Sequence, residues 1–149
     1  MIGNAGVDAI TGDTGADYLD GAVGNDVDTL AGGAGNDTYA ITDAGEADVY
    51  IEAASAGTDT ILVTGDLDAS AAVFGTGSNT PAASMANFEQ IVIANDADAT
   101  FTAAQLTGLS LTLNTASGAA ASVVTINGGA GDETLDISGI AVTASAYTL

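Results

Sequence analysis

The chain has 149 residues, the length of one ordinary domain, and contains 20 Asp and Glu residues but no Lys, Arg or His, so its formal net charge is −20. Without basic side chains it cannot neutralise phosphates, which argues against nucleic-acid binding and against attachment to anionic membranes. Without His, Cys or Lys it lacks the usual catalytic base, thiol nucleophile and Schiff-base amine, and neither disulfides nor imidazole or thiolate metal sites can form.

The composition nevertheless predicts a folded protein. Hydrophobic residues make up 47% of the chain, whereas disordered acidic chains are poor in them. No run of apolar residues is long enough to span a membrane, so we expect no membrane insertion, and residues 1–4 do not begin a signal-peptide pattern. Because no side chain carries a positive charge, any close cluster of carboxylates requires a cation from solution.

Residues 3–40 form four short repeats. Each has Gly at its first and fourth positions, Asp at its sixth and a large apolar residue at its eighth, and the third repeat carries two extra residues. The Asp residues are Asp8, Asp17, Asp26 and Asp37, and the apolar residues are Ile10, Leu19, Leu30 and Tyr39. The residues after each Asp alternate in polarity, which predicts a turn followed by a short strand with one inward side chain.

This pattern resembles the RTX nonapeptide family, whose consensus is G-G-x-G-x-D-x-U-x. A fifth copy, residues 128–136, departs from the consensus because Glu133 stands at the Asp position, with Asp132 beside it. The resemblance implies an all-β, right-handed parallel β-solenoid, an RTX β-roll that continues into a β-helix with almost no helix, and it implies several bound Ca²⁺ ions. Solvent-exposed turns would explain the Gly and Asp residues, but not their fixed phase with an apolar position.

Calcium takes six to eight oxygen ligands from carboxylates and backbone carbonyls, and glycine turns allow both to approach one point. The expected carboxylate ligands are Asp8, Asp17, Asp26, Asp37, Asp59 and Asp132. The expected backbone carbonyls lie around Gly3, Gly6, Gly12, Gly15, Gly21, Gly24, Gly32, Gly33, Gly35, Gly128, Gly129 and Gly131. No catalytic residue and no organic cofactor is expected.

The resemblance also implies that two nonapeptides make one coil. Turns on the same side would then lie about 18 residues apart, twice the length of a nonapeptide, which would stack Asp8 on Asp26. Asp17 and Asp37 are separated by two residues more than this, and they would stack if Val27 and Asp28 bulged outward.

The remaining chain divides by composition. Residues 1–66 hold 13 of the 20 acidic residues and are expected to be the calcium-binding coils. Within them, Asp59 is either a final ligand or a solvated turn residue, and Glu52 is expected to be a solvated carboxylate at a strand edge. Residues 67–87, rich in Ala, Ser and Gly, are expected to form a loop or protrusion. Residues 88–149 alternate Thr or Ser with apolar residues, which predicts a continuing β-helix, with one helical turn at residues 102–106 and a degenerate repeat near the end.

These features favour a secreted or cell-surface structural protein that folds on calcium binding. The resemblance implies type I secretion, and repeats close to both ends of the chain, with no polar cap, predict head-to-tail self-association into a filament or lattice, as in an S-layer. The alternative is a fragment of a larger RTX adhesin, S-layer protein or exoenzyme. Enzyme motifs such as H-E-x-x-H and G-x-S-x-G are absent, and an ice-binding role is less favoured because no regular Thr ladder recurs.

Overall fold

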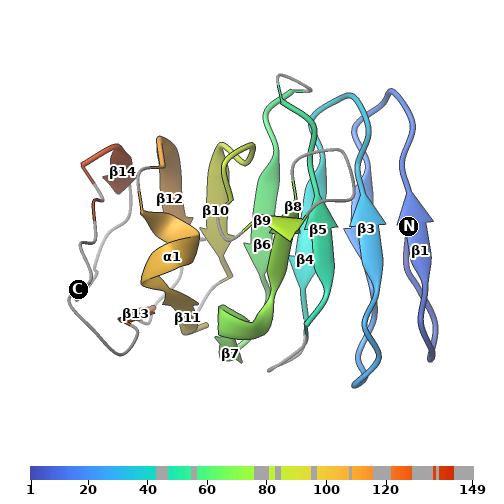
Figure 1. Cartoon of the computed structure of the whole chain (residues 1–149), viewed down its shortest axis with the longest axis horizontal. Helices are drawn as coiled ribbons and strands as arrows, with labels where there is room; N and C mark the ends of the chain where they lie inside the picture. Colours follow the sequence, from blue (N-terminus) through green and yellow to red (C-terminus); the bar gives the residue numbers. More distant parts are fainter. Residues whose placement is uncertain are drawn as a thin grey trace.

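The computed structural model describes residues 1–42, 47–54, 57–75, 81–82, 85–94, 97–107, 109–115, 122–128, 136 and 138–142. Short strands stack along the long axis of the molecule, from the N-terminal end to the C-terminal end (Figure 1). Among the described residues every strand pair is parallel except one. The molecule is therefore a nearly all-β solenoid with parallel sheets, as the sequence predicts.

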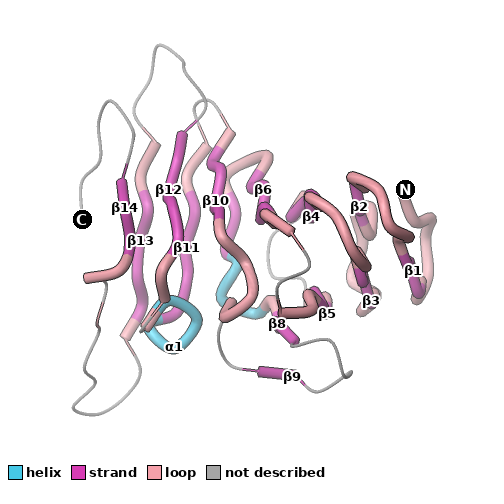
Figure 2. The backbone as a smooth tube through the Cα atoms, turned by 90° about the horizontal axis from the view of Figure 1, so that it is seen from above, coloured by secondary structure: helices cyan, strands magenta, loops and turns pink. Residues whose placement is uncertain are grey.

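The strands form three sheets, and successive strands of the N-terminal half alternate between two of them (Figure 2). The six-stranded sheet contains β2 (Tyr18–Asp20), β4 (Thr38–Ile41), β6 (Thr60–Val63), β10 (Gln90–Ile93), β12 (Leu111–Thr115) and β14 (Ile140–Val142). The five-stranded sheet contains β1 (Ala9–Thr11), β3 (Thr29–Ala31), β5 (Val49–Ile51), β8 (Val73–Gly75) and β9 (Pro81–Ala82), of which β9 is antiparallel to β8. The third sheet contains β7 (Leu67–Asp68), β11 (Ala99–Thr102) and β13 (Val124–Asn127).

The first coils are longer than two nonapeptides. Ala9 pairs with Thr29, and the Asp8 N–H donates to the Asp28 side chain 20 residues further along the chain. This corrects the shorter coil expected from the repeat length. It also corrects the expected bulge, since Asp28 is only 4% exposed. Residues on one face of a strand alternate with a period of two, so burying Leu30 beneath Ile10 places Asp28 in the position that Asp8 occupies in the previous coil.

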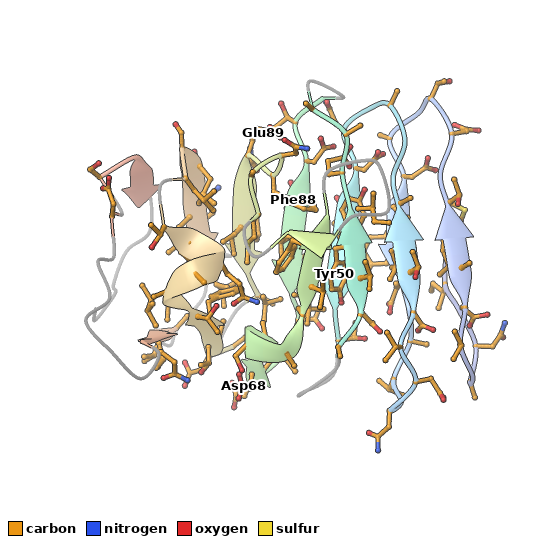
Figure 3. All side chains as sticks on the ribbon, in the orientation of Figure 1. Tyr50, Asp68, Phe88 and Glu89 are labelled. Carbon is orange, nitrogen blue, oxygen red and sulfur yellow. The ribbon has the colours of Figure 1, made fainter. Side chains whose placement is uncertain are left out.

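The six-stranded and five-stranded sheets each contribute a column of inward side chains to the core. One column contains Leu19, Tyr39, Ile61, Ile91 and Leu113, which are paired in register along the six-stranded sheet. The other contains Ile10, Leu30, Tyr50 and Phe74. The two columns meet in an aromatic group. The centroid of the Tyr39 ring lies 6.2 Å from that of Tyr50 and 5.2 Å from that of Phe88, and both ring pairs are packed edge to face. Figure 3 shows Tyr50 and Phe88 between the strands.

The solenoid widens in its C-terminal half. Thr60 pairs with Gln90, and the Asp59 N–H donates to the Glu89 side chain 30 residues further along the chain. The third sheet adds a further side to the coil. The turn α1 (Ala103–Leu106) begins with a capping box between Thr102 and Gln105, which confirms the helical turn expected at residues 102–106. The Gln105 amide donates to two backbone carbonyls, those of Ala69 and Ala72, at 3.0 Å.

Residues 67–87, for which a loop or protrusion is expected, contain strands β7, β8 and β9 and the 3-10 turn η1 (Ala69–Ala71). Strand β8 continues the five-stranded sheet beside β5. The proposed domain boundaries stay a prediction. Within the described ranges, no helix has the length and apolar character needed to cross a membrane.

Candidate metal centre

A carboxylate precedes each strand of the first coils, and these carboxylates are stacked in two rows. The first ladder contains Asp8, Asp28 and Asp48, which precede β1, β3 and β5. The second ladder contains Asp17, Asp37, Asp59 and Glu89, which precede β2, β4, β6 and β10. Asp28, Asp37, Asp48 and Asp59 are all buried.

Each ladder is joined by hydrogen bonds from the backbone of one coil to the side chain of the next. In the first ladder the Asp8 and Asp28 backbone N–H groups donate to Oδ1 of Asp28 and Asp48 at 2.7 and 2.8 Å. In the second ladder the donors are the N–H groups of Asp17, Asp37 and Asp59, and the acceptors are Asp37, Asp59 and Glu89, each at 2.8 Å. Like charges are therefore stacked near the coil spacing of about 4.8 Å, and no basic side chain separates them.

The second oxygen of a ladder carboxylate faces a glycine turn. Asp8 Oδ2 accepts a hydrogen bond from the Asn4 N–H at 2.7 Å, and Asp17 Oδ2 accepts one from Asp13 at 3.0 Å. A Cβ added to Gly3 would lie 2.8 Å from Asp8 Oδ2 and 2.6 Å from the Gly21 carbonyl oxygen. A carboxylate oxygen and a carbonyl oxygen of the next coil therefore converge in a space that a side chain would fill.

The same arrangement recurs one strand later. A Cβ on Gly12 would contact Asp17 Oδ2 at 2.6 Å and would also meet the carbonyl oxygen of Gly32. Not every predicted turn glycine is needed in this way, because the nearest atom to a Cβ on Gly15 would be 3.6 Å away. The oxygen-lined turns fit a hard cation such as Ca²⁺, which takes mixed carboxylate and carbonyl ligands.

Four of the six carboxylates that the sequence predicts as ligands stand in the ladders. These are Asp8, Asp17, Asp37 and Asp59, and the buried position of Asp59 excludes the alternative of a solvated turn residue. Asp26 is exposed and lies outside both ladders, where its Oδ2 accepts from the Gly6 N–H at 3.1 Å. Asp132, Gly129 and Gly131 lie outside the described residues, and Gly128 is exposed.

Sequence reasoning missed three ladder residues, Asp28, Asp48 and Glu89. A local signal could have found the first two, because each stands two residues before an inward side chain, Leu30 and Tyr50 respectively. Glu89 stands two residues before Ile91 in the same way. The ladder carboxylates are therefore found better by their position immediately before a strand than by the sixth position of each repeat.

The second ladder leads to a buried carboxylate cluster formed by Asp37, Glu52 and Asp59. Their exposed fractions are 1%, 0% and 1%, and one ligand oxygen from each lies within 4.8 Å of the others. This corrects the expectation that Glu52 is a solvated strand-edge residue. Glu52 is buried because the Tyr39 ring, packed in the core, brings its hydroxyl to 2.5 Å from Glu52 Oε2.

Hydrogen bonds hold the cluster in place. The Tyr39 hydroxyl accepts the Gly32 N–H at 2.5 Å and lies 2.7 Å from the Ile51 carbonyl oxygen, while Glu52 Oε1 accepts the Ala53 N–H at 2.7 Å. A hydroxyl carries one proton, so Tyr39 can donate fully to only one of its two acceptors, Ile51 and Glu52.

Burial dominates the proton affinities in the cluster. It raises the pKa of Glu52 to about 7, although the hydrogen bonds from Tyr39 and Ala53 oppose this shift. Burial likewise raises the pKa of Asp59 and lifts that of Tyr39 far above its ordinary value, so Tyr39 stays neutral. Burial therefore makes the charged forms of Glu52 and Asp59 less favourable, as expected for carboxylates removed from water.

One comparison with known proteins identifies the repeats. Residues 1–28 match the family model described as "RTX calcium-binding nonapeptide repeat (4 copies)". Neither the comparison with curated proteins nor that with solved structures gives a match. Residues 1–28 are thus RTX-type repeats, a class that binds calcium, and this range includes Asp8, Asp17 and Asp28 of the ladders.

Proposed function

We propose that this chain is a secreted or cell-surface structural protein whose N-terminal coils fold when Ca²⁺ binds in the repeat turns. The observation that carries the proposal is the stacking of seven carboxylates in two ladders, in a chain without a single Lys, Arg or His. Stacked carboxylates repel one another, and a cation held between coils reverses the sign of that interaction.

The ladder carboxylates and the glycine carbonyls beside them would hold the ions. Asp8 would act with the carbonyl of Gly21, and Asp17 with that of Gly32. Because these oxygens come from different coils, the site does not exist in the unfolded chain, and the free energy of binding becomes free energy of folding.

The repeat class supports a proposal for export and location. RTX repeat proteins are typically secreted by the type I route and act outside the cell, where calcium is abundant. A chain whose first coils stay unfolded at low calcium suits passage through such a channel, and this supports an extracellular structural role of the S-layer, adhesin or matrix kind. We propose no catalytic role for the described carboxylates, since they are committed to the turns.

We further propose that copies associate head to tail. Strand β1 has a neighbour on one side alone among the described strands, and large apolar side chains in this N-terminal part of the chain are exposed, including Ile2 at 67%, Val7 at 76% and Val23 at 69%. Open strand edges pair with other chains. The alternative is that this region is the calcium-dependent folding module of a larger RTX protein, whose adjoining coil would cover the same edge.

A calcium titration of the whole chain, followed by far-UV circular dichroism, tests the proposal. We expect β-sheet signal to increase with Ca²⁺, to be lost on adding EGTA, and to respond weakly to Mg²⁺, which demands a tighter octahedral site. An unchanged spectrum with EGTA and with millimolar Ca²⁺ would refute calcium-dependent folding. Electron microscopy of the calcium-loaded product then separates filaments or lattices from isolated monomers, which would refute the assembly.

A further inference from the structure

The buried carboxylate cluster of Asp37, Glu52 and Asp59 differs in construction from the turn sites. Asp37 precedes β4 and Asp59 precedes β6, both in the six-stranded sheet, whereas Glu52 directly follows β5 in the five-stranded sheet. A ladder joins coils on one side of the solenoid. The cluster instead brings together carboxylates from both sheets.

One oxygen of the cluster has no hydrogen-bond partner among the residues that the structure describes. Asp37 Oδ1 accepts the Asp17 N–H, but Asp37 Oδ2 is buried and accepts no hydrogen bond. A Cβ on Gly32 would meet both this oxygen and the Tyr39 hydroxyl, so the orphaned oxygen lies on the side where Tyr39 contacts Glu52. A buried carboxylate oxygen without a donor is unfavourable, and because the chain has no Lys, Arg or His, the positive partner for this oxygen has to be a cation from solution.

The spacing of the cluster suits one calcium ion. Two ligands of the same Ca²⁺ can be at most about 4.8 Å apart, twice the usual distance of about 2.4 Å from ion to oxygen. The ligand oxygens of Asp37, Glu52 and Asp59 all lie within 4.8 Å of one another. Hard carboxylate donors and the absence of nitrogen and sulfur ligands favour Ca²⁺ over transition metals.

We propose that Glu52 is a cation ligand and that it acts with Asp37 and Asp59 to form one closed calcium site that fastens the two sheets together. Tyr39 is a positioning residue, since its hydroxyl holds Glu52 Oε2 at 2.5 Å while its ring packs on Tyr50 and Phe88. This site rests on the proposed calcium-dependent folding, but it adds a ligand that the repeat pattern does not contain.

Terbium luminescence tests the site, because Tb³⁺ replaces Ca²⁺ at oxygen sites and is excited by a neighbouring tyrosine. The chain has no Trp and 4 Tyr residues, and Tyr39 touches the cluster. In the whole wild-type chain we expect a tyrosine-sensitised emission that is displaced by Ca²⁺, and we expect the part of it that comes from this ion to be lost in Glu52→Gln. Absence of this emission would overturn the proposal without any variant.

The substitution Glu52→Gln keeps the size of the side chain and one acceptor oxygen, which can still accept the Ala53 N–H, and it removes the charge. We expect one fewer bound ion in equilibrium dialysis, or that ion bound at least about tenfold more weakly. Removing a residue that merely orients a metal ligand typically lowers the affinity for the metal by about tenfold or more, and removing a ligand should lower it at least as much. Tyr39→Phe should reduce the sensitised emission and weaken this ion less. Unaltered stoichiometry, affinity and emission in Glu52→Gln would overturn the proposal.

Asp68→Asn is the matched control, since it removes one negative charge far from the cluster. The exposed Asp68 lies at the opposite end of the strands from Glu89 (Figure 3), and Asn can replace it as the cap of η1. It should bind the same number of ions as wild type. Circular dichroism of the same samples separates the two proposals: failure of the wild-type chain to respond to Ca²⁺ refutes the folding proposal, whereas a normal response with unchanged ion binding in Glu52→Gln refutes this site alone.

Discussion

The two ends of the solenoid are built from the same parallel strands but depend on different interactions. In the first coils, β1 has no fully buried residue and Ile10 is only half-buried, while carboxylates and glycine turns fill the edges. In the C-terminal half, Ile91, Ile93 and Phe101 are completely enclosed. Strands β2 and β3 each bury one large apolar side chain, Leu19 or Leu30, whereas β6 and β10 each bury two, so the first coils contribute a smaller part of the apolar core than the later ones.

This difference suggests a division of roles along one fold. A narrow coil, like those at the N-terminal end, encloses one inward side chain per strand, so burial alone contributes little to its stability. A cation that binds between coils can compensate for this small contribution of apolar burial to the free energy of folding. We expect the wider coils around Phe101 to be stable without a cation, because they enclose more apolar surface and residues 67–149 hold only seven of the 20 acidic residues. We expect calcium dependence to fall from the N-terminal end toward the C-terminal end.

Removal of calcium should produce the largest difference in stability between the N-terminal and the C-terminal coils. With EGTA, the amides of β3 and β4 should exchange with deuterium at the rate of an unfolded chain, because the ladders repel once the ions are gone. The amides of β10 and β12 should remain protected, since solenoids unfold coil by coil. Mass-spectrometric hydrogen exchange measures both regions in one sample, and equal loss of protection in both would contradict the difference.

The next largest effect is expected at the first ladder. Asp28→Asn removes a buried carboxylate that accepts from the Asp8 N–H, and it should raise the calcium concentration at the folding midpoint about tenfold or more, which corresponds to about 1.4 kcal/mol. Asp26→Asn, an equal change in charge at an exposed carboxylate outside the ladders, should shift the midpoint by less than about twofold, or about 0.4 kcal/mol. Circular dichroism at graded calcium concentrations compares the two. A larger shift for Asp26→Asn would contradict the stacking of Asp28 on Asp8 and would favour a register in which one coil consists of two nonapeptides.

A methyl group in a turn tests the close approach of the coils. Gly12→Ala would place a Cβ against the Gly32 carbonyl and Asp17, and it should destabilise the calcium-loaded protein by about 1–3 kcal/mol, as overpacking does. Gly15→Ala is the control, because a Cβ there has its nearest neighbour at 3.6 Å. Urea unfolding in saturating calcium gives both values, and equal effects at the two glycines would argue against the turn geometry.

The smallest effect is expected in the C-terminal half, which we expect to be stable without calcium. Thr102→Ala removes the cap of α1 and should cost about 1 kcal/mol, with or without calcium. Thr125→Ala, at an exposed position on β13, should change the stability by less than about 0.5 kcal/mol. Urea unfolding in EGTA and in Ca²⁺ should give the same cost for Thr102→Ala; a cost that appears in Ca²⁺ alone would show that this half also depends on the ion.

Much of the fold could be predicted from local patterns. The repeat of Gly, Asp and an apolar residue predicts short strands and glycine turns, and the capping pair Thr102 and Gln105 predicts the helical turn. The ladder positions of Asp8 and Asp17 were predictable for the same reason. The spacing of the repeats favoured Asp26 over Asp28, although Asp28 stands two residues before the inward Leu30; pairing of Leu30 with Ile10 in the neighbouring coil is what stacks Asp28 on Asp8.

The sequence by itself determined the strand-and-turn alternation and the chemistry of the partner, because side-chain periodicity is local and a chain with 20 acids and no bases can be neutralised only by ions from solution. Only the tertiary structure decided the register that stacks Asp28 on Asp8 and the burial of Glu52. Tyr39 meets Glu52 across 13 residues, and Glu89 meets Asp59 across 30. Such contacts depend on how whole coils stack, which residue spacing alone does not specify.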